Sequence, residues 1–276
     1  MDTRINLNRL LRRCILPLLG LSLLAASGVG HAVVVNGGSS SYGEWVNLTV
    51  DPLIGPDVTV TSGPVPTSAG TAPAPYNDPD NLASVSVGGS GISMLTGLLT
   101  TNASSDIDGT PGYRYASADA SVANLSLGVT SFLGDLLGLK VGLIQSSATI
   151  GGDYGALTAV GTTTLADVFL SVPLGLPLDA RPAPNTHVAG ALLQPLGVSL
   201  ILNEQILSGD GLTSRGLEVN AIHLAFTGFV LGLNVLNGDV IIGHSEAQVS
   251  AVPAPPALLL LGSSLLGLLG FRRRAA

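Results

Sequence analysis

Regular alternation of apolar and polar residues is the feature that most constrains how this chain folds. Val46, Leu48 and Val50 alternate with polar neighbours, and the same period of two recurs in residues 116–122 and 198–203. A period of two places apolar side chains on one face of a strand, whereas one face of a helix repeats every 3.6 residues. The pattern therefore predicts half-buried β-strands along most of the chain.

Turn signals separate the alternating runs. Asp108-Gly109, Gly151-Gly152, Asp210-Gly211 and Asn237-Gly238 are dipeptides typical of tight turns. We therefore expect one all-β domain over residues 33–251, an antiparallel, sandwich-like fold flanked by an N-terminal signal helix and a C-terminal transmembrane helix.

Finer expectations concern individual segments of this domain. Residues 198–205, 217–226 and 240–248 should be neighbouring strands of one sheet, because short turn-rich links join them. The proline-rich segment at about 63–80 should be a loop, since proline cannot donate to a strand ladder.

The chain also contains an internal echo. Residues 122–127 resemble residues 219–224, and each is followed by a Leu/Gly-rich stretch and then by a second similar segment, 144–148 or 242–247. A duplicated strand–loop–strand unit would produce this pattern. Chance similarity in a composition rich in Leu, Gly, Ser and Val would also produce it, and both readings stay open.

Charge excludes one class of partner. Between residues 33 and 270 there are 17 acidic residues and four basic ones. A body this acidic repels phosphate backbones, so we expect no nucleic-acid binding. Cys14 is the only cysteine and lies in the predicted signal, so the mature protein would have neither disulfide nor thiol chemistry.

Residues 1–32 have the three parts of a secretory signal peptide. Four arginines precede an apolar run at 15–26, and a small-residue site predicts cleavage between Ala32 and Val33. The expected partners are the secretion translocon and signal peptidase. An uncleaved anchor is the alternative, but the twelve apolar residues span about 18 Å, well short of a core of about 30 Å.

Residues 252–276 form a second targeting segment, with a transmembrane helix expected at about 256–271 and basic residues on its cytoplasmic side. The segment resembles the PEP-CTERM sorting tail, although Ala254 stands where that family has Glu. The resemblance implies recognition by an exosortase-type membrane protease and release to the cell surface. A permanent membrane anchor is the alternative. The residues that would carry sorting are Val252, Pro253, Pro255, Arg272, Arg273 and Arg274.

The body of the chain resembles the bacterial choice-of-anchor P family. The similar segments are residues 116–127, 183–186, 202–205, 209–211, 219–224 and 238–247. This resemblance implies a surface-displayed domain without established enzymatic activity, and it brings no catalytic residues and no cofactor.

Two acidic turns are candidate calcium sites. Asp78 and Asp80 lie in one oxygen-rich turn and Asp106 and Asp108 in another, and Ca²⁺ prefers such clustered oxygens. Aspartates are also ordinary turn formers. Convergence of the four would favour an ion- or carbohydrate-binding module.

A second candidate group lies in the late strands and consists of His223, His244, Glu204 and Glu246. His244 and Glu246 are two residues apart and should share a strand face, a spacing that suits a metal or acid–base chemistry. Single polar residues on a solvated face are the commoner case. No phosphate-binding loop or nucleophile elbow occurs, so we do not expect an enzyme.

Two threonine motifs raise ice binding as a minor hypothesis. Thr59 and Thr61 form one T-x-T pair, and Thr162 and Thr164 form another. Neither belongs to a regular repeat.

These observations favour an exported, surface-anchored structural or adhesive protein of the cell envelope or extracellular matrix, with extracellular polysaccharide as a possible partner. A secreted carbohydrate- or calcium-binding module is the alternative, and a hydrolase is the least favoured. Fold class by itself does not decide between them.

Overall fold

The computed structural model describes residues 33–131, 134–171 and 175–253. Val33–Val252 form one compact unit. The predicted signal peptide, Pro255, the transmembrane segment at about 256–271 and the three terminal arginines lie outside the described residues. Among the described residues, no helix has the length and apolarity needed to cross a membrane.

Six strands form the first sheet, called sheet A. Their order across the sheet is β12-β13-β14-β15-β1-β2, and every neighbouring pair is antiparallel. In chain order the strands are β1 (Val33–Pro52), β2 (Val58–Thr71), β12 (Thr186–His187), β13 (Val198–Ser208), β14 (Ser214–Leu231) and β15 (Asn234–Val252).

Nine strands form sheet B, which is also antiparallel. Its centre is the hairpin of β7 and β8; β7 pairs with β6 and β5 along different parts of its length, and β8 pairs likewise with β9 and β10. The strands are β3 (Tyr76–Leu82), β4 (Ser86–Gly89), β5 (Ile92–Leu95), β6 (Leu99–Ser105), β7 (Arg114–Ser131), β8 (Gly134–Gly152), β9 (Thr158–Ala166), β10 (Phe169–Ser171) and β11 (Leu176–Pro177).

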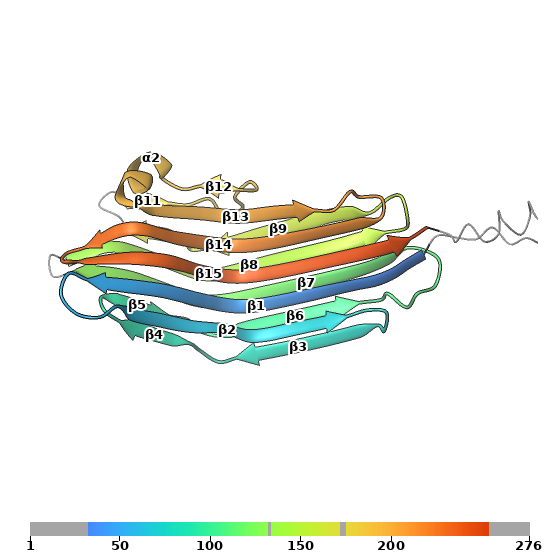
Figure 1. Ribbon diagram of the computed structural model, residues 1–276, viewed down its shortest axis with the longest axis horizontal. Helices are drawn as coiled ribbons and strands as arrows, with labels where there is room; N and C mark the ends of the chain where they lie inside the picture. Colours follow the sequence, from blue (N-terminus) through green and yellow to red (C-terminus); the bar gives the residue numbers. More distant parts are fainter. Residues whose placement is uncertain (1–32, 132–133, 172–174, 254–276) are drawn as a thin grey trace, which may run out of the picture. The chain divides into compact units, whose positions relative to one another are not determined.

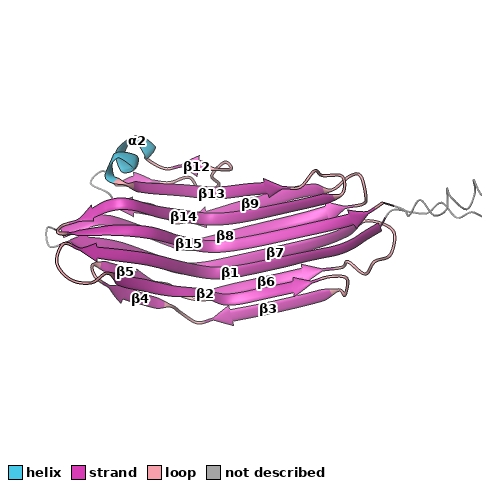
Figure 2. Cartoon of the chain, viewed as in Figure 1, coloured by secondary structure: helices cyan, strands magenta, loops and turns pink. Residues whose placement is uncertain are grey.

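The two sheets lie in two layers, as Figures 1 and 2 show. The described helical structure is limited to α2 (Gly190–Leu193) and a 3-10 turn at Gln194–Leu196. The all-β, antiparallel prediction is confirmed. The three late segments predicted as neighbours are also confirmed, since they form β13, β14 and β15 side by side.

The prediction of a loop at about 63–80 is wrong. Most of this segment belongs to β2 and β3, with only a short turn between them. Both strands lie at sheet edges, where a strand has one neighbour and a missing proline N–H costs little. Sequence reasoning treated proline as a breaker and did not consider edge strands.

The interior contains two apolar clusters. The larger is built mainly of Leu and Val, whereas in the smaller Ala is the most frequent residue. Hydroxyl groups link the sheets: Ser146 Oγ lies 2.8 Å from Ser245 Oγ, and Ser68 Oγ lies 2.8 Å from Thr101 Oγ1. These buried polar groups are therefore paired with each other, as burial requires.

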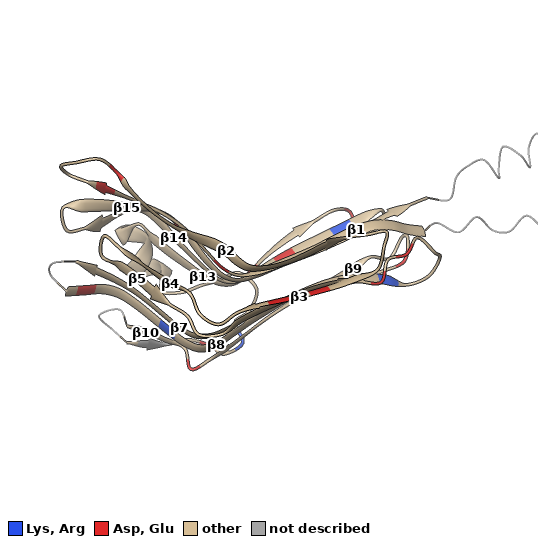
Figure 3. Cartoon of the chain, turned by 90° about the horizontal axis from the view of Figure 1, so that it is seen from below, with Lys and Arg blue, Asp and Glu red and all other residues tan. Residues whose placement is uncertain are grey.

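Both sheets bend along a line of pairing irregularities. The ladders skip Asn203 and Ala221 between β13 and β14, Gly43 and Gly243 between β1 and β15, and Asn124 between β7 and β8. Each gap leaves out one residue of both strands, so the register is unchanged and the gaps are local breaks in pairing rather than bulges. Figure 3 shows both layers bent at the middle, with the outer face of sheet A on the inside of the bend.

The internal echo coincides with two matching hairpins. β7 and β14 each have 18 residues, and β8 and β15 each have 19. The matched hairpins belong to opposite sheets, and the Ser146–Ser245 hydrogen bond joins them at the centre of the sandwich. Val122 is the ninth residue of β7 and Val219 the sixth of β14, so equal strand lengths do not align the echo and both readings stay open.

Candidate functional site

The outer face of sheet A carries a group of interacting polar side chains at the bend, called here the carboxylate–histidine network. Cross-strand pairing aligns Glu204, Asn220, His244 and Tyr42 in one row across β13, β14, β15 and β1. The members of the network are Tyr42, Glu204, Glu218, Asn220, His223, Asp239, His244 and Glu246. Three of the four predicted late-strand residues thus lie close together, and the fourth, Glu246, is in the adjacent row.

Asn220 is the centre of this network. Its Nδ2 donates to Glu204 Oε2 at 2.9 Å and to Glu218 Oε1 at 3.0 Å, and its Oδ1 accepts from His244 Nδ1 at 2.7 Å. Asn220 is only 2% exposed although it faces outward, because it lies inside the bend and under its neighbours. All three bonds hold side chains of the network to each other.

His223 joins two carboxylates. Its Nδ1 lies 2.8 Å from Glu204 Oε2 and its Nε2 lies 3.3 Å from Asp239 Oδ1. Both carboxylates only accept, so the two bonds form together only when both ring nitrogens carry protons. In that state the side chain is a cation between two anions, which is a structural ion pair.

His244 stacks on Tyr42, with ring centroids 4.2 Å apart and planes 9° apart. Burial lowers the pKa of His244, and the nearby Glu218 carboxylate opposes this shift. Burial also raises the pKa of Tyr42, and Glu218 and Glu246 raise it further. Both shifts favour the neutral form of the ring. The prediction that His244 and Glu246 share a face is confirmed, since both lie on the outer face of sheet A.

The four aspartates proposed for calcium have local hydrogen-bonding roles. The main-chain N–H groups of Ala69, Asn81 and Tyr115 donate to Asp78, Asp80 and Asp106, respectively.

Asp108 pairs with Arg114 at 2.9 Å. Hydrogen bonds from Thr110, together with Arg114, hold the pKa of Asp108 below its usual range. Within the described ranges, no group of three or more His, Cys, Asp or Glu side chains is arranged to hold a metal ion.

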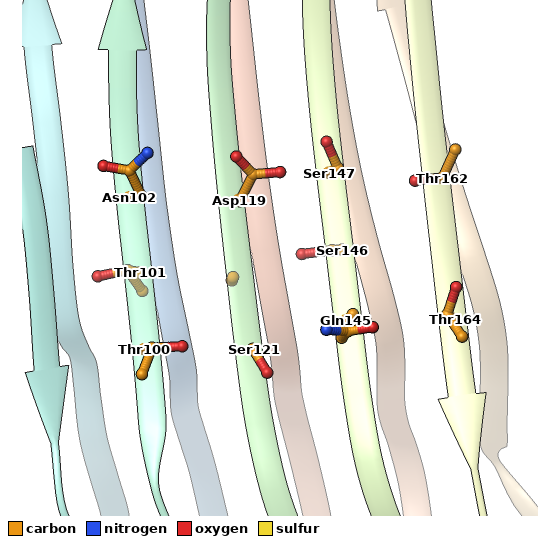
Figure 4. A pocket seen from close by; sticks show the side chains of 11 residues that line it. Thr100, Thr101, Asn102, Asp119, Ser121, Gln145, Ser146, Ser147, Thr162 and Thr164 are labelled. Carbon is orange, nitrogen blue, oxygen red and sulfur yellow. The ribbon is translucent and has the colours of Figure 1, made fainter. Parts of the chain in front are cut away.

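The outer face of sheet B carries a different surface, called here the polar array. It comprises two rows that cross β6, β7, β8 and β9 (Figure 4). One row is Thr100, Ser121, Gln145 and Thr164, and the other is Asn102, Asp119, Ser147 and Thr162. These residues line a shallow depression of about 370 Å³.

The side chains of the polar array form no hydrogen bond with any described part of the chain. Asn102 Oδ1 is also buried and has no partner there. Because solvent does not reach this oxygen, it is an unsatisfied buried atom, and the accessible groups of the array are the exposed side chains such as Gln145 and Thr162. In contrast to the network on sheet A, this surface leaves its donors and acceptors available.

The two threonine pairs lie on different sheets. Thr162 and Thr164 belong to the polar array on β9, whereas Thr59 and Thr61 lie on β2 beside Thr49 and Asn47 of sheet A. They do not form one continuous ladder.

Sequence reasoning named Thr162 and Thr164 but missed the array to which they belong. Each of its four strands carries two polar residues separated by one, a pattern visible in the sequence. The register that brings the four pairs into two rows depends on long-range pairing, which no local pattern contains.

Comparisons with protein-family models, curated proteins and solved structures give no match to this chain. Of the residues predicted for processing, Val33 begins β1 and Val252 ends β15. The two residues pair with each other at one end of the domain.

Proposed function

We propose that this chain is an exported structural or adhesive module, displayed on the cell surface or in the extracellular matrix. The observation that carries the proposal is the pairing of Val33 with Val252 at one end of a long sandwich. The predicted cleavage site and the predicted sorting tail adjoin these two residues, so a tail anchored at a membrane would leave the rest of the domain free.

The dimensions of the domain support display. β1 and β15 stay paired from Val33 and Val252 to Pro52 and Asn234. Twenty residues of strand extend about 60 Å. The opposite end carries the β1–β2 turn, where Leu53 and Ile54 are 73% and 90% exposed. A tail-anchored domain would hold this turn and both broad faces away from the membrane.

The resemblance of the tail to the PEP-CTERM family and of the body to the choice-of-anchor P family points to the same role. In this proposal signal peptidase cleaves between Ala32 and Val33, and an exosortase-type protease recognises the segment that begins at Val252. The acidic body with four basic residues suits an extracellular surface rather than a nucleic-acid partner.

Two measurements on one tagged protein test the proposal. An epitope inserted after Gly55 should bind antibody on intact cells, because this exposed turn lies at the end opposite Val33 and Val252. Mass spectrometry of the mature protein should show an N-terminus at Val33 and, in hosts with an exosortase, loss of the tail. An epitope found only inside the cell would refute export, whereas an intact N-terminus on a displayed chain would replace signal cleavage with the uncleaved anchor.

A control separates sorting from simple anchoring. In a strain without the exosortase, the same tagged chain should stay in the membrane fraction at higher mass. Equal mass and equal membrane retention in both strains would show that the tail is a permanent anchor rather than a sorting signal.

A further inference from the structure

The polar array combines regular spacing with unused hydrogen-bonding capacity. Adjacent strands lie about 4.8 Å apart, so each row of four side chains spans about 14 Å from β6 to β9. The two rows alternate with inward-facing residues such as Ala120 and Ser146, which keeps the eight side chains on one face (Figure 4). The surface can therefore contact an extended ligand at several points.

The chemistry of the array indicates an uncharged, hydroxyl-rich ligand. Five of its eight members carry hydroxyls, namely Thr100 on β6, Ser121 on β7, Ser147 on β8, and Thr162 and Thr164 on β9. Hydroxyls and amides both donate and accept, which matches the groups of a sugar. Asp119 is the single charged side chain of the array, within a domain whose acidic residues greatly outnumber its basic ones.

The shape of the surface indicates a polymer rather than a small sugar. Small-molecule sites are concave and bury most of their ligand. Here the depression is shallow and its lining residues Thr100, Asp119, Gln145 and Thr162 are exposed. An open surface binds each unit weakly, and a chain that crosses several strands gains from repeated contacts.

We propose that the polar array binds a neutral polysaccharide chain laid across β6, β7, β8 and β9. The proposal rests on the proposed function, since a displayed domain would meet such chains in the extracellular matrix. The threonine and serine hydroxyls and the Gln145 amide donate to and accept from the sugar hydroxyls. The acidic domain disfavours anionic polysaccharides.

Affinity gel electrophoresis tests this proposal on the full chain, solubilised in a zwitterionic detergent without a sugar headgroup. The gels contain dextran or hydroxyethyl cellulose as neutral probes, or alginate as an anionic probe. At least one neutral polymer should retard the protein, and alginate should not. Equal migration in all gels, or retardation by alginate alone, would overturn the proposal.

A matched pair of variants locates the binding surface. The variant Gln145→Ala/Thr162→Ala/Thr164→Ala removes three side chains of the array, and at the usual strength of neutral hydrogen bonds it should weaken retardation about tenfold or more. Thr59→Ala/Thr61→Ala removes the equivalent T-x-T pair from β2 of sheet A and should bind like the parent. Equal binding by the triple variant would overturn the assignment to sheet B.

Thermal unfolding of each variant shows whether it is folded, and Ser121→Glu provides a second test if the triple variant is unstable. Ser121 is one of the two inner residues of its row. The larger glutamate side chain should block the contact surface and abolish retardation, and it should do so by its size, because a neutral sugar is not repelled by the charge.

The two proposals fail separately. A protein displayed on cells that binds no neutral polymer refutes only the polysaccharide site, whereas a protein that is not exported refutes the proposed function.

Discussion

The outer faces of the two sheets use similar polar side chains in opposite ways. On sheet A, Asn220 bonds Glu204, Glu218 and His244, and the network satisfies its own donors and acceptors. On sheet B, the side chains of the polar array form no hydrogen bond to the described chain, and Asn102 Oδ1 is left without a partner. Polar residues on a sheet face therefore indicate binding only when their bonds are not already made.

The bend accounts for part of this difference. Residues on the inside of a bend are brought together, so His244 is only 7% exposed on an outward face. Figure 3 shows sheet B on the outside of the same bend. On that face Thr100, Gln145 and Thr162 remain exposed. Shape thus favours a structural role for the polar side chains of one face and leaves those of the other accessible.

The largest expected effect comes from the centre of the network. Asn220→Ala should lower the free energy of unfolding by about 3 kcal/mol, because it leaves buried partners unsatisfied. Gln145→Ala, on the polar array, should change it by less than about 0.5 kcal/mol. Urea unfolding of both variants provides the measurement. Similar losses in the two variants would remove the distinction between the faces.

A pair of glycine variants tests whether the bend is under packing constraint. Gly243 has a φ of +67°, and an added Cβ would lie 3.1 Å from Ile144 Cγ2. Gly109 has a φ of +76° but an open environment. Gly243→Ala should cost about 2 kcal/mol and Gly109→Ala about 1 kcal/mol, since only the first adds crowding to backbone strain. Equal thermal shifts would show that the bend tolerates the methyl group.

Glu44 gives a smaller, pH-dependent effect. It is fully buried between the sheets; Ser62 Oγ donates to its Oε1 at 2.6 Å, and its Oε2 has no partner in the described chain. Burial raises the pKa of Glu44, and the Ser62 bond partly opposes this. The charged form is therefore disfavoured in the folded state. The stability that the protonated Glu44 carboxyl contributes is fully present below its pKa in the unfolded chain, and it is lost as the pH rises through its pKa in the folded protein.

Glu44→Gln should consequently unfold at a higher urea concentration than the parent at pH 8, and the two midpoints should converge near pH 4. Asp119→Asn, an equally conservative change on the exposed polar array, serves as the control and should not reproduce this pH-dependent gain. A Glu44→Gln variant that is less stable than the parent at pH 8 would show that the carboxylate is stabilised by contacts other than the Ser62 bond.

Much of the fold could be predicted from local pattern. Alternation at residues such as Val46, Leu48 and Val50 identified strands, and Asp210-Gly211 identified a turn. In the structure Asp210 accepts main-chain hydrogen bonds from Leu212, Thr213 and Ser214, which explains why the residue favours that turn.

Features that depend on pairing could not be predicted in this way. Residues 63–80 look like a loop because a short stretch of sequence does not show whether a strand will lie at a sheet edge. The edge position of β2 is what allows Pro64 and Pro66 in that strand. Predicting that His223 lies next to Glu204 would also have required the register of β13 and β14, because that ladder skips Asn203 and Ala221. Predicting the polar array would have required the registers of three strand pairs at once.

Threonine methyl NMR of the full chain tests the contrast between the faces most directly, because both faces carry threonines. With ¹³C-methyl-threonine labelling, addition of the neutral polymer that retards the protein should shift the signals of Thr100, Thr162 and Thr164 on sheet B. The signals of Thr59, Thr61 and Thr67 on sheet A should stay in place. Shifts confined to the sheet A threonines, or no shift on either face, would contradict the account.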